Sequence, residues 1–307
     1  MVKKKRKLFR YTIIRSIVFS EVTIGIAANT ILLLFHISIF LFKHRPKPLD
    51  LTIAQLALIH LVMLTTVSFI ATDTFGFQSW DGLTCKLVIY VYRLMRALSI
   101  CTTCLLSVLQ AIILCPRSSC LAKFKQKSSH HYPSCLGFLW VFNMLLNGHF
   151  LVSIGATSNV MSHNLVFVTE SCSLWSINYF FKYIFLSLVN IQDVSFIGLM
   201  TLSSGYMVSL LCRHKRQFQH LHSTSLCPNA SPEERATRTI LLLMVFFMLM
   251  YILDCVSFSS LAILWNNDPL HLCVLMVVSN GYATICPFVL MTSEKRIAES
   301  LKSRWKR

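Results

Sequence analysis

The sequence has 307 residues, of which 55% are hydrophobic and only 13% are charged, and its formal net charge is +17. Soluble proteins usually contain about 25% charged residues, so these values exclude a water-soluble domain and favour a chain surrounded mostly by lipid. With only nine glycines and eight prolines, collagen-like and disordered chains are excluded as well. A multi-pass membrane protein remains.

The apolar runs predict seven membrane-spanning helices in a single all-α domain over residues 1–307. A helix needs about 20 residues to cross a hydrocarbon core of roughly 30 Å, and the runs lack the alternation of barrel strands. The first run continues from Ile17 to Phe42 without a small-residue cleavage pattern, which favours a span over a signal peptide. The predicted spans are 17–42, 49–71, 85–114, 134–155, 177–212, 239–265 and 270–292.

Basic residues in the connecting loops predict the orientation in the membrane. The loops after the first, third and fifth spans and the C-terminal tail carry most of the Lys and Arg residues, whereas on the opposite side only Lys86 borders the loop between the second and third spans. Basic loops stay in the cytoplasm, so we expect the amino terminus outside and the carboxy terminus in the cytoplasm. The basic segment from Lys3 to Arg15 opposes this orientation. Because the positive charge lies beside the spans, membrane lipid is its expected partner, and nucleic acid is not.

Twelve cysteines cannot all be paired, because a disulfide needs both partners in an oxidising compartment. Cys85 and Cys172 lie clearly on the predicted outer side, so we predict a disulfide between them, with Cys273 as a possible third external thiol. Two free thiols are the alternative. Cys101 and Cys104 lie inside a span, where they are expected to pack as small apolar residues.

The sequence contains none of the common hydrolase or nucleotide-binding motifs, and its cysteines and histidines fit no familiar zinc spacing. We therefore expect a binding protein rather than an enzyme, with no metal and no cofactor. Lone histidines inside spans are expected to form hydrogen bonds between helices. They are His36, His60 and His149.

Two arginines in the third predicted span are the strongest indication of a binding site. Arg93 and Arg96 lie on one helical face, about 12 and 16 Å below the start of the span. Asp254 lies at a similar depth, so an Arg96–Asp254 ion pair and a cationic pocket for anionic or hydrogen-bond-accepting ligands both remain open. Tyr92 would add an aromatic wall, and Lys182 would lie near the entrance.

Four stretches resemble vomeronasal type 1 receptors, a family of chemosensory G-protein-coupled receptors. CTTCLLSVLQAIILCPRSS at 101–119 resembles the end of the family's third span, and CKLVIYVYRLMRA at 85–97 resembles its upper part. The third inner loop, with ASPEERAT, and CPFVLM at 286–291 also agree. Bitter taste receptors share the architecture but lack this inner-loop signature. A transporter or channel is a further alternative, which would show polar lines through several spans.

The resemblance implies a receptor in the plasma membrane of vomeronasal sensory neurons that binds pheromone-like small molecules and couples to a Gi/Go protein. Leu109, Gln110 and Ala111 stand where rhodopsin-like receptors have an acidic-Arg-aromatic triplet. The basic inner loops would flank the G protein, although the same charges could simply face solvent and lipid. The residues predicted to face the G protein are Gln110, Arg117, Arg213, Lys215, Arg216 and Arg235.

Overall fold

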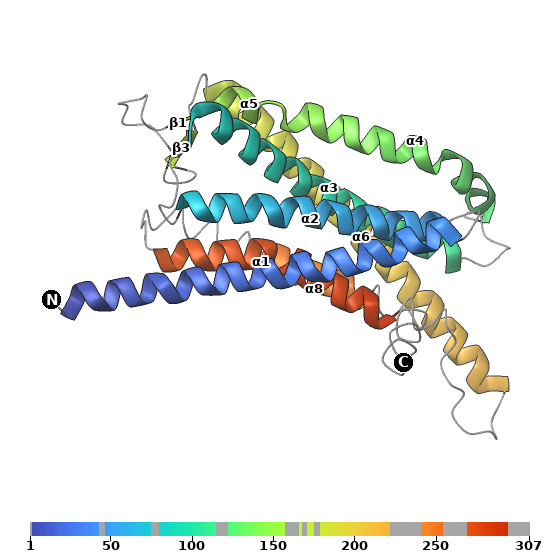
Figure 1. The fold of residues 1–307 in the computed structure, drawn as a ribbon. Coiled ribbons are helices and arrows are strands. Elements are labelled where there is room, and N and C mark those ends of the chain that lie inside the picture. Colours follow the sequence, from blue (N-terminus) through green and yellow to red (C-terminus); the bar gives the residue numbers. More distant parts are fainter. Residues whose placement is uncertain are drawn as a thin grey trace.

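Helices make up most of the chain that the computed structural model describes, which is residues 2–42, 47–74, 80–114, 122–156, 166–167, 171–174, 179–221, 241–253 and 269–293. The helices are α1 (Val2–Phe42), α2 (Pro48–Thr74), α3 (Gly82–Leu114), α4 (Ala122–Asn147), the short α5 (Phe150–Ser153), α6 (Tyr179–Leu221), Leu241–Leu253 and α8 (Pro269–Ser293). Apart from α5, one helix lies at each of the seven predicted positions (Figure 1), so the all-α seven-helix fold is confirmed.

Five helices in the described part of the chain are long and apolar enough to cross a membrane. Hydrocarbon offers no partner for backbone N–H and C=O groups, so an apolar run must satisfy them within its own helix. The limits of the spans within these helices stay a prediction. The apolar segments are Thr12–Phe42, Pro48–Thr74, Gly82–Ile113, Tyr132–Ser153 and Val274–Met291.

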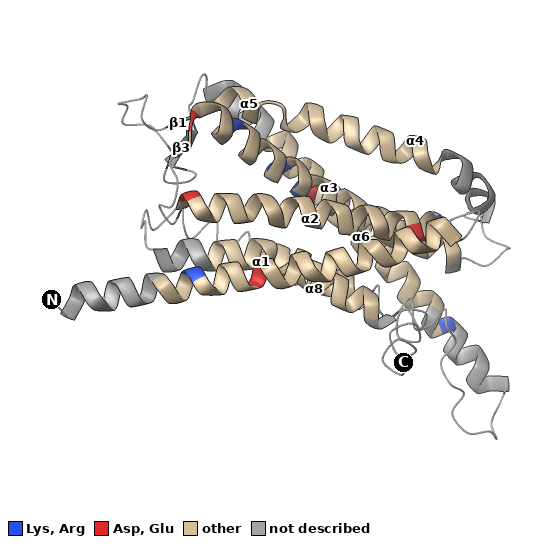
Figure 2. Cartoon of the chain, viewed as in Figure 1, with Lys and Arg blue, Asp and Glu red and all other residues tan. Residues whose placement is uncertain are grey.

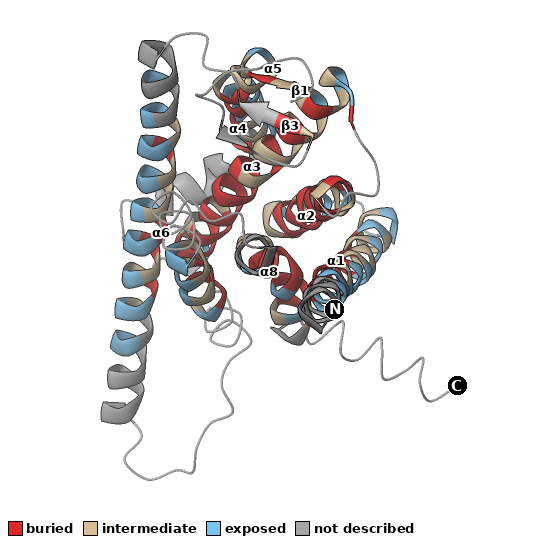
Figure 3. Ribbon diagram, turned by 90° about the vertical axis from the view of Figure 1, so that its left-hand side faces the viewer, coloured by how far each residue is buried: buried red, intermediate tan, exposed pale blue. Residues whose placement is uncertain are grey.

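The central helix of the bundle is α3, which contacts α2, α4, α6 and the segment after α4. In its most apolar window 72% of the residues are buried, against 28% in α1 and 17% in α4. Figure 3 shows the same contrast, with α2 and α3 mostly buried and the outer faces of α1 and α6 exposed. The exposed faces of the outer helices carry large apolar side chains such as Leu41 in α1, Phe138 in α4 and Leu202 in α6, as expected for surfaces that face lipid.

A small sheet covers the end of the bundle that contains the Cys85–Cys172 bond, which we call the disulfide end. After α4 the chain turns at Gly148, forms α5 and enters β1 (Ile154–Ala156). Antiparallel pairing joins β1 to β3 (Cys172–Leu174) and β3 to β2 (Val166–Phe167), in the order β1-β3-β2. This sheet was not predicted from the sequence. Both α1 and α8 begin at the disulfide end, and α8 ends at the opposite end (Figure 1).

Two of the described helices far exceed the length that a membrane crossing requires. α1 has 41 residues and α6 has 43, so at about 1.5 Å per residue each is roughly twice as long as a 30 Å hydrocarbon core. The basic segment from Lys3 to Arg15 therefore forms the first turns of α1 and is not a separate extension. α6 continues helically beyond residue 212, the predicted end of its span, to Leu221.

Gly25 allows α1 to approach α2 and α8 closely. A Cβ at this position would lie 2.7 Å from Leu64 Cδ1, 2.8 Å from Thr284 Oγ1 and 3.3 Å from the Thr284 backbone. One turn later, the Asn29 side-chain amide donates to the carbonyl of Gly25 at 2.8 Å and to that of Ala283 in α8 at 2.9 Å. The missing side chain thus lets a buried hydrogen bond join the two helices.

We expect Gly25→Ala to lower the free energy of unfolding by about 1 to 3 kcal/mol, as is typical of overpacking. The thermal midpoint of the purified protein in detergent should fall accordingly. Gly281→Ala is the matched control. A Cβ there meets the terminal methyl of Met250, which a flexible side chain can withdraw, so its midpoint should fall less. Equal losses in the two variants would contradict the argument.

Candidate ligand-binding site

A cavity of about 40 Å³ lies between α2, α3, Leu241–Leu253 and α8. A single water needs roughly 10 to 15 Å³ on this measure, so the cavity has room for a few waters. Its polar lining consists of Arg96, Ser99, Tyr251, Ser279 and Tyr282.

Apolar side chains form the rest of the wall. Met63 contributes from α2, Ile100 from α3, and Phe247 and Met250 from the Leu241–Leu253 helix. One cation beside hydroxyl groups, thioethers and aromatic rings is suited to a small ligand with an apolar body and a hydrogen-bond-accepting group.

The three residues of α3 that were predicted to contact a ligand lie in different surroundings in the structure. Arg96 lines the cavity. The guanidinium of Arg93 instead lies over the ring of Phe150 in α5, with Cζ 5.3 Å from the ring centroid. Tyr92 packs against the apolar cluster that contains Ile59. Arg93 is one turn closer to the disulfide end than Arg96, so it reaches α5 instead of the cavity.

Two other predicted ligand contacts lie outside what the structure describes. Asp254 follows the last described residue of the Leu241–Leu253 helix, and Lys182 lies in α6 with an undescribed side chain. An Arg96–Asp254 ion pair therefore stays a hypothesis beside the cationic pocket.

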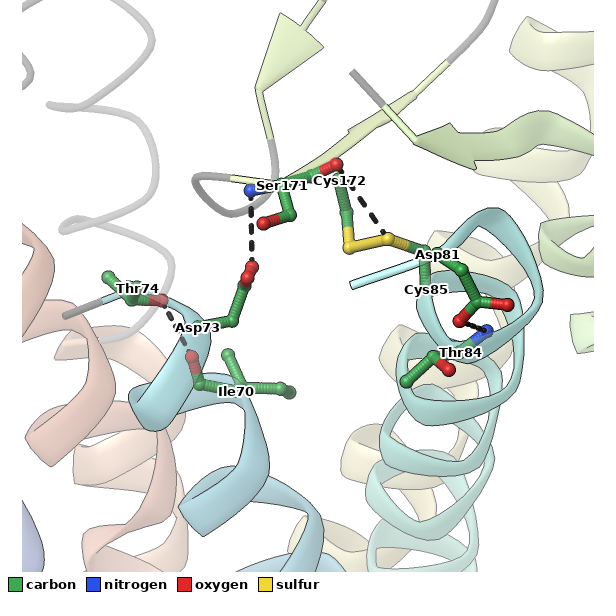
Figure 4. Close-up of a disulfide and its surroundings, with 8 residues drawn as sticks. All are labelled: Ile70, Asp73, Thr74, Asp81, Thr84, Cys85, Ser171 and Cys172. Atoms are coloured by element: carbon green, nitrogen blue, oxygen red, sulfur yellow. Dashed lines mark hydrogen bonds between the residues drawn. A yellow bond between two sulfur atoms is a disulfide. The ribbon is translucent and has the colours of Figure 1, made fainter. Parts of the chain in front are cut away.

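The disulfide end is fixed by one covalent bond and two carboxylates (Figure 4). Cys85 at the start of α3 is bonded to Cys172 in β3, as the sequence predicted, with their Cα atoms 5.7 Å apart. The buried Asp73 at the end of α2 accepts a hydrogen bond of 3.2 Å from the backbone N–H of Ser171. Together these contacts hold Ser171 and β3 against α2 and α3.

The second carboxylate belongs to Asp81, which precedes α3. Its Oδ1 accepts a hydrogen bond of 3.2 Å from the backbone N–H of Thr84 and so caps the helix. Hydrogen bonds from Thr84 lower the pKa of Asp81 below its ordinary value. The charged cap therefore stabilises the start of α3 at neutral pH, and its contribution is lost as the pH falls through this lowered pKa.

At the wall of the cavity, polar side chains join α3 to α2 and α8. His60 Nε2 lies 2.9 Å from Ser99 Oγ, and the Tyr282 hydroxyl lies 3.1 Å from Thr103 Oγ1. All four residues are buried. Here His60 forms the predicted hydrogen bond between helices.

The other two histidines differ from this prediction. His149 bonds to the carbonyl of Leu146 in its own segment at 3.0 Å, because the turn after α4 directs the ring back along the chain. Among the described residues, neither ring nitrogen of the buried His36 has a hydrogen-bond partner.

A second polar group joins α3 to α4 and α6. The Gln192 side chain donates to Asn143 Oδ1 at 2.7 Å, and both amides lie 3.5 Å from the sulfur of Cys101. Cys104 is also buried. Both thiols lie inside the bundle as expected, and Cys101 in addition accepts hydrogen bonds from two neighbouring helices.

Figure 2 shows how sparse charged residues are along the coloured parts of the helices. Of the residues predicted to face a G protein, Gln110 is buried near the end of α3, and Arg213 is exposed on α6. Lys215 and Arg216 lie in α6, but their side chains are outside the described set. Arg117 and Arg235 are outside the described residues altogether.

The comparison with known proteins decides the family. Residues 12–303 match the profile of the vomeronasal organ pheromone receptor family. The chain is 54% identical over 290 residues to vomeronasal type-1 receptor 90 of Rattus norvegicus, an alignment that covers 94% of this chain and 93% of the relative. It is 48% identical over 304 residues to vomeronasal type-1 receptor 51 of Mus musculus, with 99% of this chain and 95% of the relative covered.

The chain belongs to this family. It is therefore a chemosensory G-protein-coupled receptor and a multi-pass protein of the plasma membrane. Membership assigns it to a family of receptors and decides against the bitter taste receptor, transporter and channel alternatives.

Most of the cavity wall was not predicted from the sequence. The predicted contacts were charged residues and Tyr92, whereas the wall contains uncharged polar and aromatic residues of the last two helices, namely Phe247, Tyr251, Ser279 and Tyr282. The spacing of Ser279 and Tyr282, three residues apart in an apolar run, indicates a shared polar face. The cavity itself depends on how four helices are rotated against one another, which this spacing does not specify.

Loss of the disulfide should destabilise the receptor. We expect Cys85→Ala, Cys172→Ala and the double variant to lose the same free energy of unfolding, about 2 to 4 kcal/mol, because each removes one cross-link. The control is Cys135→Ala, which replaces an exposed free thiol and should leave the thermal midpoint unchanged. A double variant clearly less stable than either single variant would show that the two cysteines act separately.

Proposed function

We propose that this vomeronasal receptor binds pheromone-like small molecules in the cavity beside Arg96 and signals through a Gi/Go protein in vomeronasal sensory neurons. The observation that carries the proposal is a half-buried arginine in the wall of a cavity formed by α2, α3, Leu241–Leu253 and α8. An intramembrane cation is costly away from a polar partner or a wet cavity. Arg96 is therefore the residue best placed to receive an anionic or hydrogen-bond-accepting ligand group.

The rest of the wall suits an adaptable apolar site. Met63 and Met250 are unbranched and flexible, so they can move aside for ligands of different outline. Because the cavity has room for only a few waters, a larger ligand must displace both the water and these side chains. Tyr92, Arg93 and Lys182 remain candidate contacts at the outer edge of the site, and Asp254 remains a candidate partner for Arg96.

We infer that the disulfide end faces the outside of the cell. Disulfides persist in oxidising compartments, and the basic loops belong to the opposite end. Ligand would then enter past the β sheet. The basic first turns of α1 would lie outside, against the usual preference of positive charge for the cytoplasm.

Signalling follows as a shift between two populations, driven by the difference in ligand affinity of the resting and active states. Gln110 is buried in the structure, so it can contact a G protein only when the helix ends around it separate. Arg213 on α6 is already exposed. Arg117, Lys215, Arg216 and Arg235 would add positive charge around the same face.

Arg96→Ala should raise the ligand concentration needed for half-maximal response at least tenfold, because a hydrogen bond to a charged group contributes about 1.5 to 3 kcal/mol. Arg93→Ala is the comparison variant. Its side chain lies over Phe150, so a smaller change is expected. The assay is nucleotide exchange in membranes from expressing cells, after a screen of sulfated and neutral steroids and small volatiles. The variants must show equal surface labelling, so that expression does not explain a difference. An unchanged dose-response curve for Arg96→Ala would show that Arg96 does not contact the ligand.

The G-protein class is tested in the same membranes. With the active ligand, co-expressed Gαi or Gαo should exchange nucleotide, and Gαs or Gαq should not. Exchange confined to Gαs or Gαq would contradict the proposed coupling.

A further inference from the structure

Tyr282 connects the cavity to three helices. The buried side chain lines the cavity from α8. Its ring packs edge-to-face on Phe247 of the Leu241–Leu253 helix, with centroids 4.6 Å apart, and on His60 of α2, with centroids 5.5 Å apart. Its hydroxyl lies 3.1 Å from Thr103 Oγ1 of α3. Any movement of this ring therefore changes contacts with α2, α3 and the Leu241–Leu253 helix together.

The hydrogen bond between Tyr282 and Thr103 has a defined direction. The Thr103 hydroxyl donates its single proton to the carbonyl of Ser99 at 2.7 Å. Thr103 Oγ1 is left as the acceptor, so the Tyr282 hydroxyl must be the donor. Ser99 lines the cavity and bonds to His60 at 2.9 Å. Both ends of the Tyr282–Thr103–Ser99 chain therefore reach the cavity wall.

Cys286 provides the Tyr282 hydroxyl with a second neighbour. It lies one turn further along α8, is buried, and its thiol is within hydrogen-bonding reach of the same hydroxyl. A buried hydroxyl that loses its only partner is costly. With Cys286 beside it, the hydroxyl can leave Thr103 and keep a partner, although sulfur is the weaker acceptor.

We propose that the Tyr282–Thr103 hydrogen bond holds the receptor in its resting state, and that Tyr282 is the positioning residue through which a ligand in the cavity shifts α8 and the Leu241–Leu253 helix relative to α3. This inference rests on the proposed function, because it takes the cavity as the ligand site. A ligand larger than a few waters presses on the Phe247 and Tyr282 rings as well as on Met63 and Met250, which line the same wall. Movement of the Tyr282 ring then separates its hydroxyl from Thr103. The bond thus differs between the two states, as coupling requires.

The test needs no ligand, since breaking the bond by mutation should favour the active state. Tyr282→Phe and Thr103→Val each remove the bond and preserve the size of the side chain. In membranes with co-expressed Gαi or Gαo, each should raise ligand-independent nucleotide exchange about fivefold, the equivalent of roughly 1 kcal/mol for one hydrogen bond. The double variant should match the single variants, because all three lack the same bond.

The chain contains a matched control pair. The Tyr132 hydroxyl lies 2.6 Å from Thr52 Oγ1, and Thr52 donates to the Pro48 carbonyl at 2.7 Å. This pair has the same chemistry and is buried, but it joins α4 to α2 away from the cavity. Tyr132→Phe should lower the thermal midpoint in detergent and leave ligand-independent exchange unchanged.

Thr103→Ser provides a conservative rescue. Serine keeps an acceptor oxygen, so this variant should have wild-type exchange. If Tyr282→Phe fails to fold, the contrast between Thr103→Val and Thr103→Ser still shows whether the hydrogen bond controls ligand-independent exchange. The inference would be overturned if Tyr282→Phe and Thr103→Val lowered the thermal midpoint but left ligand-independent exchange unchanged, because the bond would then be merely structural. Additive effects on exchange in the double variant would overturn it as well. Failure of the proposed function has a different signature, namely a wild-type receptor that drives no exchange on any co-expressed G protein.

Discussion

The constraint on which this structure depends is that polar groups surrounded by lipid must find partners inside the protein. α3 is the helix that satisfies it. Ser99 and Thr103 on one side of α3 connect to α2 and α8, and Cys101 on another side connects to α4 and α6. The large apolar residues of the outer helices need no such partners and face outward. The bundle is thus organised around the polar side chains of its central helix.

The cavity follows from the same arrangement. Arg96 lies one turn before Ser99 on α3, so the cation is placed directly beside the buried polar group. At the disulfide end, the bond between Cys85 and Cys172 joins β3 to the start of this same helix. A single helix therefore connects the sheet, the cavity and the buried Gln110 near the opposite end. Under the proposed function, this helix would carry a change at the cavity to the face proposed for the G protein.

The seven helices and the disulfide were predictable from the sequence, because both depend on local properties. The length of apolar runs indicates helices, and the side of the membrane limits which cysteines can pair. Arg96 was also found, since a charge in an apolar run is conspicuous. The sheet β1-β3-β2 was missed because its strands have two or three residues each. Tyr282 and the different surroundings of Arg93 and Arg96 were missed because helix rotation and packing, rather than local pattern, determine them.

The most direct test of the account is whether the cavity beside Arg96 opens to the outside of the cell. Ser279 lines it from α8, so Ser279→Cys in a Cys273→Ser background can be treated with a membrane-impermeant thiol reagent on intact cells. The account predicts labelling of intact cells above the Cys273→Ser background alone, and less labelling when an active ligand is present. Labelling that requires permeabilised cells would contradict both the position of the site and the orientation of the chain.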